Sequence, residues 1–263
     1  MNRPPNALAV AEGQTAIGAG CMGCHSVGLP NADGSVGNCA QCHSRHSTSV
    51  ELVRLPETCG QCHMGPDHSQ YEIYSESKHG VLFNAERDRM NLNVAPSRLT
   101  TKDMPVPTCS TCHMSGLEGA EATHDTTGRL SYWLFAAVSK RRPDYEQRQK
   151  AMQGICLNCH AQPSIRRFYA QAETVVESTN QLVEQAEQVI QGLRDDGLLT
   201  PTPFDEPIEF QYFDYWHYYG RTAKHGAFMG GADFVQWHGN YELKAKLVDL
   251  QQSAAELREA ARR

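Results

Sequence analysis

Apolar residues recur at helical spacing in two long segments of the C-terminal half. Residues 165–196 contain no proline and no glycine before Gly192, and their apolar positions keep the three-to-four-residue spacing of an amphipathic helix. Gly197 then ends the pattern. Residues 241–263 carry a second stripe formed by Leu243, Leu247, Leu250, Ala254 and Leu257. The sequence therefore predicts two long helices, the first about 32 residues or roughly 48 Å long.

The remaining segments show no such period. Residues 1–70 are rich in glycine, asparagine, serine and histidine, which favours loops and short helices. Residues 78–108, with three prolines, and residues 123–143 are predicted to be long connections, whereas residues 204–219 are dense in aromatic side chains. Strand signals are absent. We therefore expect an all-α fold.

All ten cysteines belong to one pattern, C-x-x-C-H, that occurs five times. The cysteines are Cys21, Cys24, Cys39, Cys42, Cys59, Cys62, Cys109, Cys112, Cys156 and Cys159, and the histidines that follow them are His25, His43, His63, His113 and His160. The pattern attaches c-type haem, because both thiols reach one porphyrin edge while the adjacent imidazole becomes the proximal iron ligand. The alternatives are disulfides or zinc, but two Cys₄ zinc sites would leave two cysteines and all five placed histidines unexplained. The sequence therefore predicts five covalently bound haem c groups.

The spacing of the motifs indicates how the chain is organised. The first three fall between residues 21 and 63, so their porphyrins must be close neighbours, which favours electron transfer among them. We expect residues 1–163 to form a pentahaem-binding part and residues 164–263 to form a part of long helices, both within one continuous domain.

Net charge and hydropathy indicate what the protein does not bind and where it is located. The net charge of −6 argues against a nucleic-acid-binding surface. No run approaches 18 apolar residues, so we expect no transmembrane segment. The apolar block within residues 1–20 is too short for a secretory signal, yet covalent haem attachment is expected outside the cytoplasm. We therefore expect a periplasmic or otherwise extracytoplasmic protein whose chain is processed, trimmed or numbered from an internal start.

Seven histidines lie outside the five motifs: His46, His68, His79, His124, His217, His225 and His238. Five bis-His haems need five of them, whereas four bis-His haems and one open iron need four, so the count permits an open site without proving it. Local context ranks His46, His79, His124 and His225 as distal ligands. His79 and His225 share a Lys-His-Gly triplet, and Asp125 follows His124, where it could orient the second ring nitrogen.

His68 stands apart from these four because it follows Gly65-Pro66-Asp67 only five residues after proximal His63. An acid and an imidazole placed side by side by a Gly-Pro turn can relay protons to a small substrate. The alternative is a further distal ligand oriented by its acidic neighbour. Spacing alone leaves both interpretations open.

Beyond its haem motifs, the chain resembles hydroxylamine oxidoreductase and its octahaem relatives. The likeness is carried, in one order along nearly the whole chain, by residues 21–25, 30–35, 39–46, 57–70, 76–80, 107–114 and 231–239. The resemblance implies that this chain is the C-terminal five-haem part of an eight-haem plan. It also implies that the haem of Cys21 and Cys24 is the catalytic one with a vacant distal side, and that Asp67 and His68 are its active-site acid and imidazole.

Two departures from that family affect the expected chemistry. The three preceding haems, which extend the electron path in the relatives, are missing here. Oxidative members also carry a tyrosine from a neighbouring subunit that is bound covalently to the catalytic porphyrin, and this chain offers Phe234 in the corresponding segment. Without that cross-link, family members are thought to favour reduction of nitrite or hydroxylamine, so the direction of the reaction stays open. Pentahaem nitrite reductases share the core haem plan, but their catalytic motif ends in lysine.

Two functions follow as hypotheses. The first is a redox enzyme that acts on hydroxylamine, hydrazine, nitric oxide or nitrite at the open haem, with Asp67 and His68 moving protons, four bis-His haems carrying electrons, and another redox protein, possibly a multihaem cytochrome, as partner. The second is an electron-transfer protein or wire subunit in which all five irons are six-coordinate. The family resemblance also implies a homotrimer built on the long helices, whereas an intramolecular hairpin of residues 165–196 with residues 241–263 would bury the same stripe without a partner.

Overall fold

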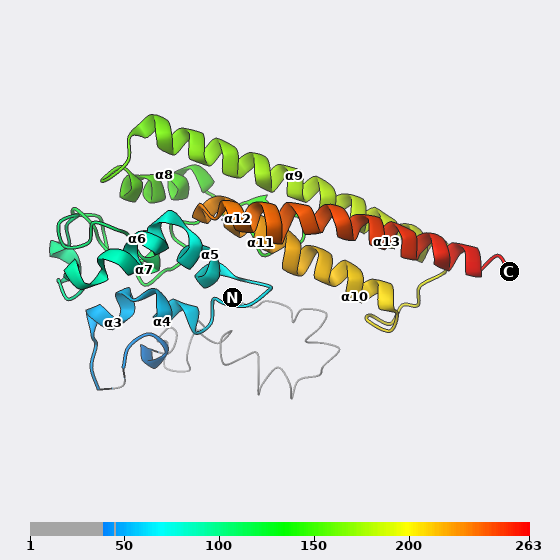
Figure 1. Ribbon diagram of the computed structural model, residues 1–263, viewed down its shortest axis with the longest axis horizontal. Helices are drawn as coiled ribbons and strands as arrows, with labels where there is room; N and C mark the ends of the chain where they lie inside the picture. Colours follow the sequence, from blue (N-terminus) through cyan, green and yellow to red (C-terminus); the bar gives the residue numbers. More distant parts are fainter. Residues whose placement is uncertain (1–38, 45) are drawn as a thin grey trace.

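A computed structural model describes residues 39–44 and 46–263. Within them the chain is all-α, as predicted, apart from one small ribbon. Short helices and loops gather at one end of the molecule, and long helices lying side by side extend from them to the other end (Figure 1). The first haem motif, at Cys21, Cys24 and His25, lies outside the described residues.

The N-terminal part consists of short elements separated by loops, as the sequence predicted for residues up to 70. They are the 3-10 turn η2 (Cys39–Gln41), α3 (Val50–Arg54), α4 (Pro56–Gly60), α5 (Gln70–Glu76), α6 (Lys78–Glu86), the 3-10 turns η3 (Arg87–Arg89) and η4 (Pro96–Arg98), α7 (Cys109–His113), strands β1 (Tyr132–Trp133) and β2 (Lys140–Arg141), and α8 (Tyr145–Cys156). Residues 78–108, predicted to be a connection, instead begin with a helix over Lys78–Glu86.

The corner between α5 and α6 is built by Ser77 and Gly80. The Ser77 side chain caps α6 by accepting a hydrogen bond from the Gly80 N–H at 3.2 Å. A Cβ at Gly80 would run into the carbonyl oxygen of Tyr74, so only glycine permits this close approach. The corner thereby fixes the position of His79 in the first turn of α6.

Three long helical rods make up the C-terminal part. The first is α9 (Gln162–Asp195); the second runs through α10 (Pro207–Asp214), the π-helix η5 (Tyr215–Gly220) and α11 (Arg221–Met229); the third runs through α12 (Ala232–Val235), the π-helix η6 (Gln236–Asn240) and α13 (Tyr241–Ala260). Helix α9 begins three residues earlier than predicted because proline is tolerated in the first turn of a helix. Gly230, in the left-handed conformation with φ 73°, ends the second rod.

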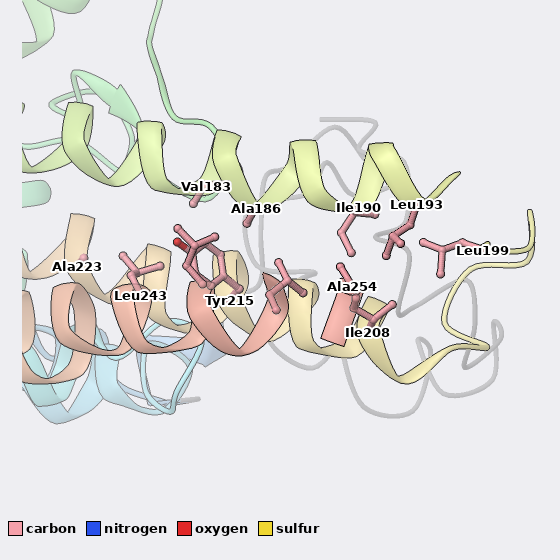
Figure 2. Packing of buried hydrophobic residues seen from close by; sticks show 12 residues of the cluster. Val183, Ala186, Ile190, Leu193, Leu199, Ile208, Tyr215, Ala223, Leu243 and Ala254 are labelled. Carbon is pink, nitrogen blue, oxygen red and sulfur yellow. The ribbon is translucent and has the colours of Figure 1, made fainter. Parts of the chain in front are cut away.

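The stripe of α9 that the sequence singled out is buried against the other two rods. Figure 2 shows side chains of all three rods meeting in one apolar core. Its buried members are Val183, Ala186, Ile190, Leu193, Leu199, Ile208, Tyr215, Ala223, Leu243, Leu247, Leu250 and Ala254. Each fully buried leucine or isoleucine contributes about 1.5–3 kcal/mol. The chain therefore covers this stripe itself, in the manner of the intramolecular alternative.

Strands β1 and β2 differ from the expectation that strands are absent. They pair antiparallel, Tyr132 with Arg141 and Trp133 with Lys140. Two side chains of α11 hold the turn between the strands. Lys224 Nζ donates to the carbonyl oxygens of Ala136 and Ala137 at 2.9 and 3.0 Å. Arg221 Nε donates to the carbonyl oxygen of Phe135 at 3.0 Å. Buried carbonyl groups need such partners, so the ribbon depends on tertiary contacts.

None of the described helices combines the length and the apolar character that a bilayer span requires.

Candidate haem-binding and active site

The described C-x-x-C-H motifs share one backbone conformation. In three of them the histidine N–H donates to the carbonyl of the first cysteine: His43 to Cys39 at 2.8 Å, His63 to Cys59 at 2.9 Å and His160 to Cys156 at 2.9 Å. The fourth forms helix α7. In such a turn, residues three and four positions apart lie on one face, so both thiols and the imidazole can address the same porphyrin. The residues therefore fit haem attachment.

The thiols of these motifs are neither bridged nor gathered into a zinc site. No disulfide joins any of the eight described cysteines. Among the described residues, the one cluster with the geometry to hold a metal ion consists of carboxylates, Asp205, Glu206 and Glu209. A tetrahedral zinc site would need four cysteine or histidine ligands to converge, and the described part of the chain offers no such convergence.

Successive attachment sites lie next to one another. The thiols of Cys59 and Cys109 are hydrogen-bonded, and Cys59 also interacts electrostatically with Cys42. At the other end of this series, Cys112 interacts electrostatically with Cys156. The four described attachment sites therefore form a connected series in sequence order, an arrangement suited to passing electrons from haem to haem.

His79 lies opposite the proximal histidine His160, at a distance that leaves room for one iron between the two rings. Its ring centre lies 6.0 Å from that of His160. Two imidazoles that ligate one iron from opposite faces hold their ring centres roughly 6 Å apart, since each ligating nitrogen lies about 2 Å from a metal ion. Burial and the charge of His160 lower the pKa of His79, so its imidazole is neutral, the form that binds metal.

The other three distal candidates differ in their surroundings. His225, on α11, is buried beside the ring of Phe135, with both ring nitrogens 3.5 Å from the amide nitrogen of Gln70. Burial and neighbouring Lys224 lower the pKa of His225 to about 3, and the proximal His63 is among the charges that act on it. His46 and His124 are exposed residues in loops. The structure thus brings His225 close to a haem motif and gives no comparable partner to His46 or His124 in its described part.

Asp67 and His68 form a pair on a tightly held loop. Asp67 Oδ1 lies 2.6 Å from His68 Nδ1, and both side chains are about one quarter exposed, at 27% and 21%. The loop is closed by a hydrogen bond from the Tyr71 N–H to the His63 carbonyl at 2.8 Å. The ring centre of His68 lies 6.3 Å from that of proximal His63. Since two ligands of one iron have a similar ring separation, this distance agrees with the distal-ligand interpretation of His68 as well as with the proton relay.

Two further side chains fix this loop from different elements. The Gly65 N–H donates to Glu72 Oε1 on α5 at 2.9 Å, and Thr222 Oγ1 on α11 donates to the Pro66 carbonyl at 3.3 Å. Gly65 has φ 91°, a conformation open chiefly to glycine. The Gly-Pro turn therefore presents Asp67 and His68 in a defined position.

The electrostatic surroundings keep the Asp67 side chain ionised. Burial opposes ionisation of Asp67, but the hydrogen bond and charge of His68 outweigh it and hold the pKa of Asp67 below its usual value. Asp67 is therefore a carboxylate near neutral pH. It can orient the His68 ring and stabilise its protonated form while a proton passes through it.

His217 joins this pair, and the sequence assigned it no role. It lies on the π-helix η5, is 8% exposed and stacks on the ring of Phe213 at 4.3 Å. Burial and Arg221, whose terminal nitrogen lies 2.8 Å from His217 Nε2, lower the pKa of His217 to about 3, and both Asp67 and His68 act on its charge. A π-helical turn, common at functional sites, leaves no sequence signature that would have found it.

Repeated haem-attachment turns on an all-α scaffold, with described cysteines that form no disulfide and a histidine facing a proximal histidine, define a multihaem c-type cytochrome. The chain belongs to the family described as "Seven times multi-haem cytochrome CxxCH", which matches residues 5–207.

Three known proteins are similar to this chain. It is 25% identical over 213 residues, 66% of its own length, to a probable nitrite reductase-hydroxylamine oxidoreductase fusion protein of Kuenenia stuttgartiensis. It superimposes on a hypothetical multiheme protein with a TM-score of 0.82 and 26% identity, covering 90% of this chain. The reducing HAO-like protein complex of Kuenenia stuttgartiensis shares the fold, with a TM-score of 0.80, 21% identity and 96% coverage of this chain. The chain spans only 24% of the fusion protein and 61% and 64% of the two solved chains.

Proposed function

We propose that this protein is an extracytoplasmic pentahaem oxidoreductase that acts on a small nitrogen compound such as hydroxylamine, hydrazine, nitric oxide or nitrite. The observation that carries the proposal is the fixed Asp67–His68 pair, 2.6 Å apart, with the buried His217 beside it. A carboxylate that orients an imidazole is an arrangement suited to proton transfer. The names of similar proteins, a probable nitrite reductase-hydroxylamine oxidoreductase fusion and a reducing HAO-like complex, support the substrate class.

In this proposal Cys21, Cys24 and His25 would hold the haem that supplies the redox chemistry and binds the substrate. Residues of the chain then supply the protons that accompany electron transfer at nitrogen. His68 holds or releases a proton at its imidazole, Asp67 stabilises the protonated ring, and the neutral His217 limits the positive charge next to His68. The loop contacts from Glu72 and Thr222 keep the pair in place.

The other four haems would relay electrons in the order of their attachment sites. We assign His79 to the haem of Cys156 and Cys159, opposite proximal His160, because of their 6.0 Å ring separation. His46, His124 and His225 complete the proposed distal set. A second redox protein, possibly another multihaem cytochrome, would exchange electrons with this series.

A pure electron-transfer role is the second candidate, and the connected series of thiols from Cys42 to Cys156 favours it as well. The two candidates differ at one iron. An enzyme has a five-coordinate haem or one with an exchangeable ligand, whereas a pure electron-transfer protein has only six-coordinate bis-His haems.

Addition of hydroxylamine, nitrite or cyanide to the ferric protein should shift part of the Soret band, and low-temperature EPR of the untreated protein should show one high-spin haem among low-spin ones. Turnover with a chemical electron donor or acceptor should accompany the shift. An EPR spectrum with low-spin bis-His haem alone, together with no spectral response to the three ligands, would establish the pure electron-transfer role instead.

We further propose a homotrimer, following the family resemblance. Since the α9 stripe is buried within the chain, the assembly would use an outer surface, and Trp237, Tyr241 and Val248 on η6 and α13 are 65%, 59% and 61% exposed. Light scattering of the haem-loaded protein should give the mass of three chains, and Val248→Glu should lower it, whereas Lys244→Glu on the same helix should not. A single-chain mass for the unmodified protein would remove this prediction.

A further inference from the structure

Arg54 is a buried cation whose hydrogen-bonding capacity is mostly unused. It is the last residue of α3 and only 1% exposed. One terminal nitrogen donates to the Leu92 carbonyl at 2.7 Å, but the other terminal nitrogen and Nε are buried without a partner. Leaving donors of a buried guanidinium unpaired is costly, so a partner for Arg54 is missing from the part of the chain that the structure describes.

Arg129 shows how the same fold satisfies a structural arginine. It is 7% exposed, and its two terminal nitrogens donate to the carbonyl oxygens of Thr111, Cys112, Ser115 and Glu121 at 2.8–3.3 Å. Arg129 therefore needs no further ligand. The contrast indicates that the unpaired donors of Arg54 serve an acceptor that residues 39–44 and 46–263 do not provide.

The acidic side chain whose charge acts on Arg54 does not supply that acceptor. Asp103 is the charge that acts on Arg54, but its Oδ2 accepts hydrogen bonds from the Thr100 N–H at 3.0 Å and the Thr100 hydroxyl at 2.6 Å. No hydrogen bond joins Asp103 to Arg54 among the described residues. The described part of the chain therefore leaves these donors of Arg54 open to an anion that is not part of it.

The surroundings of Arg54 identify the chemical class of this anion. Helix α3 packs against α4 and α7, which carry Cys59, Cys109 and Cys112. Each haem brings two propionate carboxylates, and a guanidinium fork matches a carboxylate in a bidentate pair. We propose that Arg54 anchors a propionate of a haem bound beside α3 and α7. This inference rests on haem attachment and not on the proposed reaction, so it stands or falls separately from the activity.

Such an anchor would have two effects on its haem. The positive charge of Arg54 would favour the reduced iron, which carries one positive charge less, and would raise that haem's reduction potential. It would also keep the propionate ionised down to low pH, so that the potential would change little with pH.

The test is a set of variants analysed by potentiometric titration, with haem content measured as pyridine haemochrome. Arg54→Gln should keep five haems but lower the midpoint potential of one, and that potential should now fall as pH rises between about 5 and 7, where the freed propionate loses its proton. Arg54→Lys should shift the potential less because the charge is kept. Arg87→Gln is the matched control, since Arg87 is 39% exposed and pairs with Glu57 at 2.8 Å; it should change neither quantity.

Fully haem-loaded Arg54→Gln with all potentials unchanged would overturn the proposal. If Arg54→Gln does not fold, redox-difference infrared spectra of protein grown with ¹³C-labelled propionate carboxyls decide the question. A labelled band that differs between the unmodified protein and Arg54→Lys supports the proposal, and identical bands reject it. A wild-type potential that moves with phosphate or sulfate concentration would place a solvent anion at Arg54 and also reject it.

Discussion

Replacing His68 with alanine should lower turnover of the nitrogen substrate by about 10²- to 10⁴-fold, the range for loss of a positioned acid–base group. Haem content and the low-spin spectrum should stay intact, because the loop is held by Glu72 and Thr222 rather than by the imidazole. Asp67→Asn should also reduce the rate, since the amide cannot stabilise protonated His68. Steady-state kinetics and EPR on the same samples measure both effects.

The chain provides a matched control for this prediction in His238. Its Nε2 lies 3.5 Å from Asp233 Oδ2, but the two side chains are 57% and 52% exposed, so His238→Ala removes an Asp–His pair in solvent and should leave turnover unchanged. A new high-spin haem in His68→Ala, with activity largely kept, would show instead that His68 is a distal ligand. In that case the Asp67–His68 pair would no longer support the proposed function.

His79→Ala should convert one low-spin haem per chain to the high-spin form and raise its reduction potential, because the iron loses a nitrogen donor. The expectation follows from the 6.0 Å separation between the rings of His79 and His160. EPR spin integration and a redox titration measure the two changes.

Lys78→Ala serves as the control for His79→Ala, because Lys78 is the exposed neighbour of His79 in the first turn of α6. It should leave the spin states unchanged. Unaltered low-spin intensity in His79→Ala, with all haems retained, would assign the distal position of the Cys156 and Cys159 haem to another residue.

Local sequence was sufficient for features whose causes are local. Each C-x-x-C-H motif needs only five consecutive residues in one turn, so the attachment sites and proximal histidines could be predicted directly. Helix α9 was predicted to within three residues because its apolar spacing, Gly197 and the following prolines act within the segment itself. Gly65 and Pro66 likewise indicated the turn that presents Asp67 and His68.

The remaining features depend on contacts between distant segments, which no local pattern records. The β1–β2 ribbon exists because Lys224 and Arg221 on α11 donate hydrogen bonds to the carbonyl groups of its turn. His217 reaches Asp67 only through a π-helical turn, and His79 meets His160 only because the α5–α6 corner directs it there. The sequence by itself determined which residues can attach haem and where the long helices run, because covalent spacing and helical period are properties of consecutive residues. Which histidines face one another, and whether the α9 stripe is covered by its own chain, were decided by tertiary packing, because only the folded chain brings those side chains within contact distance.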